Sequence, residues 1–143
     1  MRYDRQIILP EIGEEGQNKL QKAKVLIVGV GGLGSPIALY LASAGVGCLG
    51  LVDDDSVSIS NLQRQVLYSE EELGKPKAVC AAQRLTSLNS EIETRYYSTR
   101  LTAENADRII QEYDIVVDGC DNFDTRYLIN DICIKQGKPY VYG

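Results

Sequence analysis

The chain has 143 residues, enough for one domain with its own core, and its 44% hydrophobic content excludes a disordered protein. Its 15 basic and 20 acidic residues give a net charge of −5, which argues against a general binder of nucleic acid or anionic membranes. No apolar run approaches the about 18 residues of a membrane span, and charges interrupt the N-terminal segment where a signal peptide is apolar. We therefore expect a cytoplasmic protein with no nucleic-acid or membrane partner.

The chain contains four cysteines and no histidine. The cysteines form no C-x-x-C pair, so we predict reduced thiols that act as small core residues, and no zinc site in this chain. The lack of histidine removes the usual general base of hydrolases and of many dehydrogenases. The cysteine positions are Cys48, Cys80, Cys120 and Cys133.

Short apolar runs predict five strands, and longer segments between them predict four helices. In chain order the sequence predicts a strand at 24–28, a helix at 35–44, a strand at 48–52, a helix at 77–88, a strand at 92–97, a helix at about 102–113, a strand at 115–117, a helix at 123–136 and a strand at 140–142. Strands that alternate with helices are joined by right-handed crossovers into a mostly parallel sheet. We therefore predict an α/β fold, a Rossmann-like doubly wound sheet that is truncated after its fifth strand.

Capping residues mark several of the predicted helix ends. Gly45 and Gly137 are predicted to end the first and fourth helices, and Asn89 to end the second in the left-handed conformation. Thr102 and Asn122 are predicted N-caps of the third and fourth helices. Ligands of such sheets bind at the carboxyl ends of the strands, so the residues after each strand are the candidates for a site.

A glycine loop, Gly29-x-Gly31-x-x-Gly34, lies between the first strand and the first helix, the context that a nucleotide-binding loop requires. Glycines let the backbone approach phosphate closely, and the helix N-terminus supplies donors. The loop is not a Walker P-loop, because Ser35 and Pro36 follow it in place of a lysine and a hydroxyl residue. Cationic partners of a triphosphate must therefore come from elsewhere in the chain.

Polar residues follow the second strand. Asp53 ends that strand, where a carboxylate accepts hydrogen bonds from ribose hydroxyls in dehydrogenases and adenylate binders alike. We interpret Asp54 as part of a solvated turn. A short helical segment is expected to hold Asn61 and Arg64 near the strand ends, where Arg64 is either a phosphate ligand or a surface residue.

Two more charged residues stand at the starts of predicted helices. Lys77 opens the second helix, where a lysine costs a few tenths of a kcal/mol against the helix dipole. This local cost suggests that Lys77 reaches a phosphate, and a tolerated exposed lysine is the alternative. Asp121 follows the fourth strand, and we expect it to face the glycine loop and to hold Mg²⁺ beside the phosphates.

Six motifs occur together, in the order R-Y-x-R-Q at 2–6, G-V-G-G-L-G at 29–34, an acid at 53, S-N-L-Q-R-Q at 60–65, K-P-K at 75–77 and D-G-C-D-N at 118–122. This set resembles the ThiF/MoeB/ubiquitin-activating family of adenylyltransferases. The VDDD run and the QRLT segment look closer to the ThiF branch, which serves thiamine synthesis, than to the MoeB branch.

The resemblance implies Mg²⁺- and ATP-dependent adenylation of the C-terminal glycine of a ubiquitin-like sulfur-carrier protein, for thiamine or molybdopterin sulfur transfer. Arg5 resembles the arginine that reaches into a partner subunit's site, so a homodimer is implied. Catalytic roles are expected for Arg5, Arg64, Lys77 and Asp121, with Asp121 as the Mg²⁺ ligand. The expected nucleotide-binding residues are Gly29, Gly31, Gly32, Gly34, Asp53, Asp55, Asn61, Gln63, Arg64, Lys77, Asp121 and Asn122.

The sequence departs from the family in one respect. Family members continue with two C-x-x-C pairs that bind zinc, and these are not present. We therefore expect residues 1–143 to be a single ATP-binding domain from a longer adenylyltransferase, with Zn²⁺ only in the remaining part. Two alternatives stay open: an NAD(P)-linked oxidoreductase, which the lack of a Tyr-x-x-x-Lys pair argues against, and a non-catalytic partner subunit of an activating enzyme.

Overall fold

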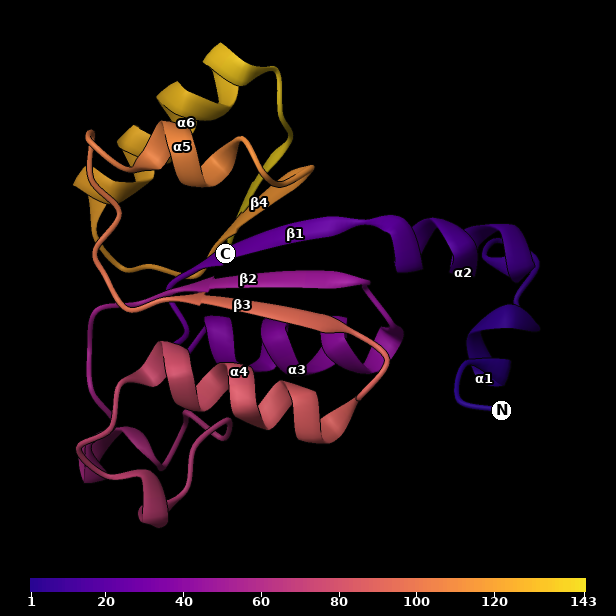
Figure 1. Cartoon of the computed structure of the whole chain (residues 1–143), viewed down its shortest axis with the longest axis horizontal. Helices are drawn as coiled ribbons and strands as arrows, with labels where there is room; N and C mark the ends of the chain where they lie inside the picture. Colours follow the sequence, from indigo (N-terminus) through magenta and orange to yellow (C-terminus); the bar gives the residue numbers. More distant parts are fainter.

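A computed structural model describes all residues from Met1 to Gly143 as one five-stranded parallel sheet with helices on both faces (Figure 1). The strand order is β3-β2-β1-β4-β5. The strands are β1 (Lys24–Val28), β2 (Cys48–Val52), β3 (Glu93–Tyr97), β4 (Ile115–Asp118) and β5 (Tyr140–Tyr142). The helices are α1 (Asp4–Ile7), α2 (Gly13–Lys22), α3 (Gly34–Ala44), α4 (Lys77–Leu88), α5 (Ala106–Ile110) and α6 (Phe123–Gln136), with 3₁₀ turns at Ile59–Asn61 and Glu70–Glu72. None of the helices has the length and apolar character of a membrane span.

Two apolar layers hold the sheet between its helices. Helices α3 and α4 cover one face, and α5 and α6 cover the other (Figure 1). The central strand β1 alternates between the layers, because Ile27 packs toward α3 and α4 while Leu26 packs toward α5 and α6; both are fully buried. This alternation is the expected pattern of a parallel strand buried on both faces, so the predicted doubly wound α/β fold is confirmed.

Most predicted element ends are confirmed. The strands differ from the predicted ranges by at most one residue, and α4 and α6 match theirs. Gly45 and Gly137 have φ angles of 89° and 66°, the left-handed conformation of a C-cap. The Asn122 side chain accepts a hydrogen bond from the Thr125 N–H at 2.8 Å, so it is the N-cap of α6.

The predicted helix at 102–113 is wrong in length. Helix α5 spans only five residues, and Asn105 rather than Thr102 precedes it. The Asn105 side chain accepts from the Thr102 N–H at 2.8 Å and donates to the Arg100 carbonyl at 3.0 Å. These bonds tie residues 100–105 into a turn, since an Asn side chain competes with the helical ladder for backbone groups.

The segment after Asp53 also differs from its prediction. The short helical segment expected there is a 3₁₀ turn at Ile59–Asn61, in which Ser58 Oγ donates to Asn61 Oδ1 at 2.9 Å. Asn89 is the second difference: its φ of −146° is extended rather than left-handed. Its side chain makes tertiary hydrogen bonds that require the extended backbone.

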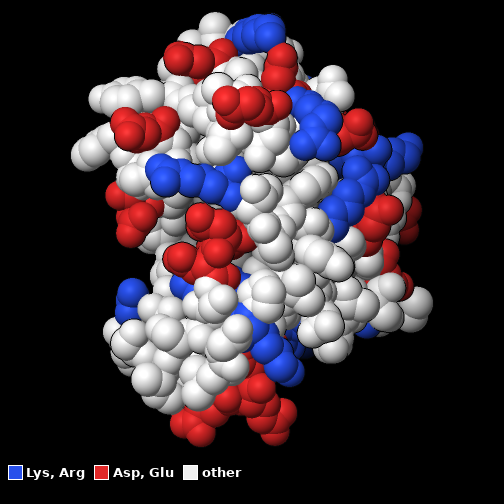
Figure 2. Space-filling model, turned by 60° about the vertical axis from the view of Figure 1, so that its left-hand side comes forward, with Lys and Arg blue, Asp and Glu red and all other residues white.

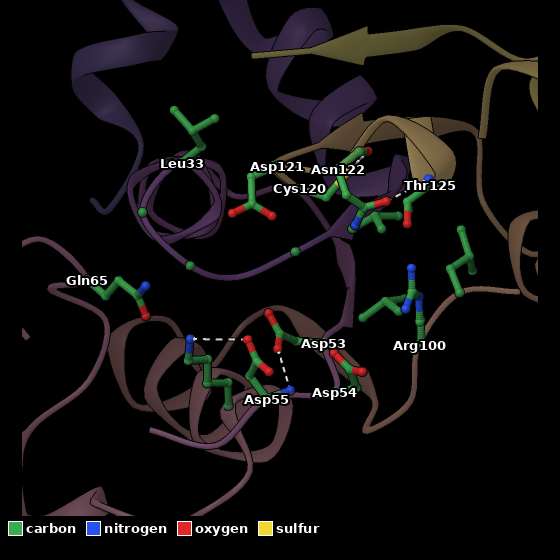
Figure 3. A pocket seen from close by; sticks show the side chains of 18 of the residues that line it. Leu33, Asp53, Asp54, Asp55, Gln65, Arg100, Cys120, Asp121, Asn122 and Thr125 are labelled. Atoms are coloured by element: carbon green, nitrogen blue, oxygen red, sulfur yellow. Dashed lines mark hydrogen bonds and ion pairs between the residues drawn. The ribbon is translucent and has the colours of Figure 1, made fainter. Parts of the chain in front are cut away.

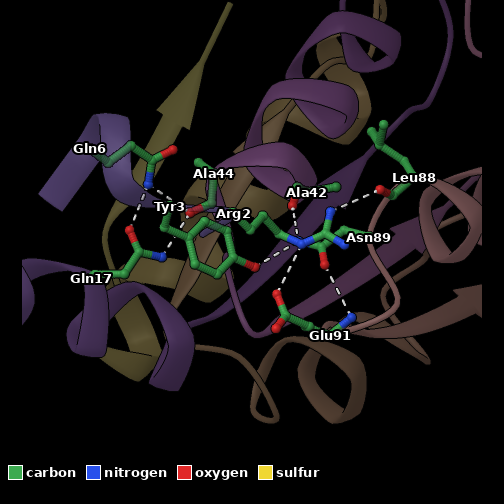
Figure 4. Close-up of polar contacts among 9 residues, drawn as sticks. All are labelled: Arg2, Tyr3, Gln6, Gln17, Ala42, Ala44, Leu88, Asn89 and Glu91. Carbon is green, nitrogen blue, oxygen red and sulfur yellow. Dashed lines mark hydrogen bonds and ion pairs between the residues drawn. The ribbon is translucent and has the colours of Figure 1, made fainter.

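The N-terminal segment packs against the end of the sheet where the strands begin. No helix is predicted before residue 24, yet α1 and α2 form there and polar contacts tie them down (Figure 4). Gln6 Nε2 donates to Gln17 Oε1 at 2.6 Å and to the Ala44 carbonyl at 3.0 Å. Arg2 Nε pairs with Glu91 at 3.0 Å. These contacts join α1 to α2 and to the C-terminal end of α3, and they join the residues before α1 to the segment that follows α4.

Asn89 is the buried centre of this N-terminal contact (Figure 4). Its Nδ2 donates to Tyr3 Oη and to the Ala42 carbonyl, both at 2.8 Å. Its Oδ1 accepts from the Glu91 N–H at 3.1 Å. A single side chain therefore links the N-terminal segment, α3 and the start of β3.

We expect Asn89→Leu to lower the free energy of unfolding by about 2–4 kcal/mol, since it leaves buried polar groups without partners. Urea denaturation followed by circular dichroism measures the change. Asn130→Leu is the matched control, because Asn130 is exposed on α6 and its substitution should change stability by less than about 0.5 kcal/mol. Equal stability of the Asn89→Leu protein and the wild type would contradict the central role of Asn89.

Candidate functional site

A cavity of about 700 Å³ opens at the carboxyl ends of β1, β2, β3 and β4. This is the edge where ligands of open α/β sheets bind. The space-filling view shows basic side chains on either side of a group of acidic ones on this face (Figure 2). The cavity is lined by Val28, Gly29, Gly31, Gly32, Leu33, Val52, Asp53, Asp54, Asp55, Asn61, Arg64, Gln65, Lys77, Thr99, Arg100, Leu101, Gly119, Cys120, Asp121, Asn122 and Thr125.

The outer glycines of the loop shape the turn from β1 to α3. Gly29 has a φ of 88°, and a Cβ atom there would lie 2.9 Å from the Cys120 nitrogen. A Cβ atom on Gly34 would lie within 1.9 Å of the Gly29 carbonyl oxygen. Any side chain at Gly29 or Gly34 would therefore displace backbone, which assigns both residues to the turn itself.

The backbone of Val30 connects the glycine loop to the segment after β2. Its N–H donates to Asp53 Oδ2 at 3.0 Å, and its carbonyl accepts from Tyr68 Oη at 2.6 Å. Asp53 Oδ1 accepts from the Asp55 N–H at 2.8 Å. Burial raises the pKa of Asp53, and the hydrogen bonds from Val30 and Asp55 act in the opposite direction. Both oxygens retain a free lone pair, so the carboxylate can still accept bonds from a ligand.

The segment between β2 and α4 folds back over the glycine loop. Arg64 covers Gly32, where a Cβ atom would lie 3.5 Å from Arg64 Nε. Gln65 covers Gly31, with Nε2 at 3.2 Å from the equivalent position. The Gln65 side chain is buried and points into the cavity from one end (Figure 3), and its Oε1 has no hydrogen-bond partner. An unpartnered buried amide beside open glycine backbone is suited to a polar ligand.

Lys77 is buried although it carries a charge. It begins α4, and its side chain is only 6% exposed. Its one ion pair is with Asp55, at the long N–O distance of 3.8 Å (Figure 3). A buried ammonium with a single distant partner is poorly compensated, so the cavity favours an anion near Lys77.

The loop after β4 forms the wall next to the glycine loop. Asp121 is exposed, and its carboxylate points into the cavity toward the acidic residues after β2 (Figure 3). Asp118, at the end of β4, holds the loop in place: it is fully buried and accepts a hydrogen bond from the Cys120 N–H at 2.8 Å. Arg126 Nη2 donates to the Cys120 carbonyl at 2.8 Å. These contacts hold Asp121 at the cavity.

Cys120 lies in the same loop but is not a reactive thiol. Burial, together with a hydrogen bond to the Asp118 carboxylate, raises its pKa to about 11. The thiol is therefore protonated near pH 7, and only thiolates act as nucleophiles. This is the behaviour predicted for a cysteine that serves packing.

Three consecutive carboxylates follow β2. The oxygen atoms of Asp53, Asp54 and Asp55 lie within 4.8 Å of one another. Asp54 and Asp55 are exposed, as expected for Asp54 in a solvated turn. The cavity thus has carboxylates from two sides, after β2 and after β4, and both are hard oxygen ligands of the type that Mg²⁺ prefers.

The structure brings together ten of the twelve expected nucleotide-binding residues. The two exceptions are Gly34, which is buried in the turn, and Gln63, which is exposed outside the cavity. Of the four residues with expected catalytic roles, Arg64, Lys77 and Asp121 line the cavity. Arg5 does not, because α1 lies at the opposite edge of the sheet (Figure 1).

Sequence reasoning missed several cavity residues. Gln65 belongs to a recognised motif, but only the structure shows that it is buried against Gly31. The segment Thr99–Leu101 carries no motif, although its place directly after a predicted strand was a usable signal. Thr125 was missed because it lies inside the predicted helix at 123–136. The structure shows that the first turn of α6, which Asn122 caps through the Thr125 N–H, lines the cavity.

Comparisons with known proteins agree with this geometry. The chain is 54% identical over 142 residues to the sulfur carrier protein adenylyltransferase of Thermus thermophilus, which covers 99% of this chain and 52% of that protein. Among solved structures, E. coli tRNA N6-threonylcarbamoyladenosine dehydratase (TcdA) in complex with AMP matches with a TM-score of 0.92 and 27% identity, over 99% of this chain and 57% of that one. E. coli MccB with ATP matches with a TM-score of 0.89 and 33% identity, over 99% of this chain and 44% of that one. The chain therefore spans about half the length of these proteins.

The chain is assigned to a family from the order of its motifs and from the arrangement of the cavity residues at the carboxyl ends of the strands. Residues 3–143 match the ThiF family, which is nearly the whole chain. The same family is indicated by the motifs of the sequence, by the parallel sheet and by the similarity to solved structures. The chain belongs to the ThiF family.

Proposed function

We propose that this protein binds ATP in the cavity and adenylates the C-terminal glycine of a ubiquitin-like sulfur-carrier protein. The observation that carries the proposal is that Arg64 and Lys77 line the same cavity as a glycine loop that has no lysine of its own. Cations beside open backbone N–H groups are what a triphosphate requires. The relative from Thermus thermophilus, named as a sulfur carrier protein adenylyltransferase, supports the same activity.

The residues of the cavity fit a nucleotide. Gly31 and Gly32 line the cavity, and a side chain at either position would contact Gln65 or Arg64. The unpartnered Oε1 of Gln65 offers a hydrogen-bond acceptor there. Asp53 retains acceptor capacity for ribose hydroxyls next to this position. The AMP and ATP complexes of the structural relatives support the same ligand class.

The chemistry requires no histidine. A C-terminal carboxylate has a pKa of about 3.5, so it is ionised near pH 7 and attacks without a general base. Its oxygen forms a bond to the α-phosphorus, the bond from that phosphorus to the bridging oxygen breaks, and pyrophosphate leaves with the electron pair. Arg64 and Lys77 stabilise negative charge on the phosphates and on the leaving pyrophosphate.

Asp121 is the residue that would hold Mg²⁺, because its exposed carboxylate points into the cavity beside the glycine loop. The bound ion would neutralise phosphate charge. The exposed carboxylates of Asp54 and Asp55 face the same space from β2. The oxygen-only donor set suits magnesium and does not suit zinc.

Only the sequence bears on the pathway in which the carrier protein works. The VDDD run at 52–55 and the QRLT segment at 83–86 favour the thiamine branch over the molybdopterin branch. In the second segment, α4 exposes Gln83 and Arg84 to solvent. The carrier is accordingly a small protein of thiamine or molybdopterin sulfur transfer that ends in Gly-Gly, and the two segments favour the thiamine pathway.

We further propose a homodimer in which Arg5 serves the partner's cavity. Arg5 is exposed and makes no side-chain hydrogen bond or ion pair, whereas its neighbours Arg2, Tyr3 and Gln6 are all bonded to the body of the protein (Figure 4). It lies at the edge of the sheet opposite its own cavity. An anchored segment that leaves one cation free supports a role in a second molecule.

A pyrophosphate-exchange assay tests the activity. With ATP, Mg²⁺ and a carrier that ends in Gly-Gly, the protein should incorporate labelled pyrophosphate into ATP. Lys77→Met should slow the exchange by about 10²- to 10³-fold, the usual loss when one donor to developing charge is removed. Lys24→Met is the control, because Lys24 is exposed at the start of β1 and should leave the rate within about twofold.

The alternatives give different results in the same experiments. Calorimetric binding of NAD⁺ without binding of ATP would indicate an oxidoreductase. Binding of both ATP and the carrier without any exchange would indicate a non-catalytic partner subunit. Either result would overturn the proposed adenylation.

Mixing two inactive variants tests the role of Arg5 in a second molecule. Arg5→Ala keeps an intact cavity, and Lys77→Met keeps an intact Arg5. In an equal mixture half of the dimers are mixed, and each mixed dimer has one complete site, so about a quarter of the wild-type exchange rate should return. No recovery after subunits have been allowed to exchange, shown by mass spectrometry of differently labelled chains, would argue that Arg5 acts within its own chain or not at all.

A further inference from the structure

The order of the strands divides the cavity into neighbouring parts. Strands β1, β2 and β3 are parallel and adjacent, so the segments that follow them lie side by side along one edge, about 5 Å apart per strand. The glycine loop follows β1, Asp53 follows β2, and Thr99–Leu101 follows β3. Given the proposed function, phosphates at the glycine loop and a ribose at Asp53 place the nucleotide base at Thr99–Leu101.

The backbone around Arg100 is held in place. Leu101 is 3% exposed and belongs to the apolar layer under α5 and α6. Asn105 Nδ2 donates to the Arg100 carbonyl at 3.0 Å, and Asn105 Oδ1 accepts from the Thr102 N–H at 2.8 Å. The anchored leucine and the braced carbonyl fix the position from which the Arg100 side chain extends to the cavity.

The Arg100 guanidinium is free within the protein. Arg100 is exposed, lines the cavity and makes no side-chain hydrogen bond or ion pair. It lies between Asp54 and Thr125, at the end of the cavity opposite Gln65 (Figure 3). Arg64, in contrast, lies against Gly32 of the glycine loop, and Lys77 pairs with Asp55, so Arg100 is the cavity cation that neither the loop nor an acidic residue holds.

We propose that Arg100 binds the nucleotide base by placing its planar guanidinium against the aromatic face. Guanidinium groups stack on aromatic rings and are attracted by the ring quadrupole, and this geometry requires an arginine rather than a lysine. Arg100 therefore contributes to affinity for the nucleoside part of the ligand and not for its phosphates. The residue belongs to no nucleotide-binding motif, and only the strand order reveals its position.

Calorimetry with ATP, AMP and inorganic tripolyphosphate separates the two parts of the site. Arg100→Ala should weaken ATP and AMP by the same factor, about tenfold, and leave tripolyphosphate within twofold. Arg100→Lys should recover less than half of the binding free energy for ATP and AMP that Arg100→Ala loses. Lys77→Met should show the opposite pattern, with tripolyphosphate weakened strongly. Arg84→Ala, at an exposed site on α4 outside the cavity, is the matched control and should change none of the three affinities.

Two outcomes would overturn the role of Arg100. If Arg100→Ala weakened tripolyphosphate as much as ATP, the residue would be a phosphate ligand; if it left AMP unchanged, the residue would not contact the nucleoside. The carrier is absent from these measurements, so they are independent of adenylation. A protein that binds ATP and AMP but exchanges no pyrophosphate would refute the proposed function. The role of Arg100 would then still be decided by the affinity measurements.

Discussion

The cavity depends on the two polar backbone groups of Val30. Its N–H donates to Asp53 and its carbonyl accepts from Tyr68, so one residue of the glycine loop is joined to two points of the segment between β2 and α4. Val30 and Tyr68 are both buried, and a buried peptide group without a partner costs about 1–3 kcal/mol. This segment therefore stays folded over the glycine loop, which brings Arg64 and Lys77 to positions that the loop itself cannot supply.

The charges of the cavity are separated in a way that matches a nucleotide. Arg64 lies at the glycine loop, Asp53 and the pair of Lys77 with Asp55 lie after the neighbouring strand β2, and Arg100 lies after β3. Asp121 points into the cavity from the opposite wall. The net charge of −5 gave no sign of these cations, because each is offset by acidic residues elsewhere on the surface. Local arrangement rather than overall charge decides which ligand the cavity favours.

Regular elements were predictable because their signals are local. A β-branched run, a glycine after a helix or an Asn before one acts within a few residues, and β1, β2, α4 and α6 follow these signals. The helix at 102–113 and the conformation of Asn89 were predicted wrongly for a shared reason. In both places an Asn side chain bonds to backbone, within a turn for Asn105 and across the fold for Asn89, and these bonds set a backbone conformation other than the one that the local sequence favours.

The sequence by itself determined the succession of strands and helices along the chain from β1 onward, the glycine turn and the motifs that mark the ThiF family, because spacing and residue type carry that information. Only the tertiary structure decided which polar residues share the cavity. It excluded Gln63, added Gln65 and Arg100, and placed Arg5 at the far edge of the sheet. The reason is that the position of a side chain at the carboxyl edge depends on strand order and on how the connecting segments fold back, and both are set by contacts between residues far apart in sequence.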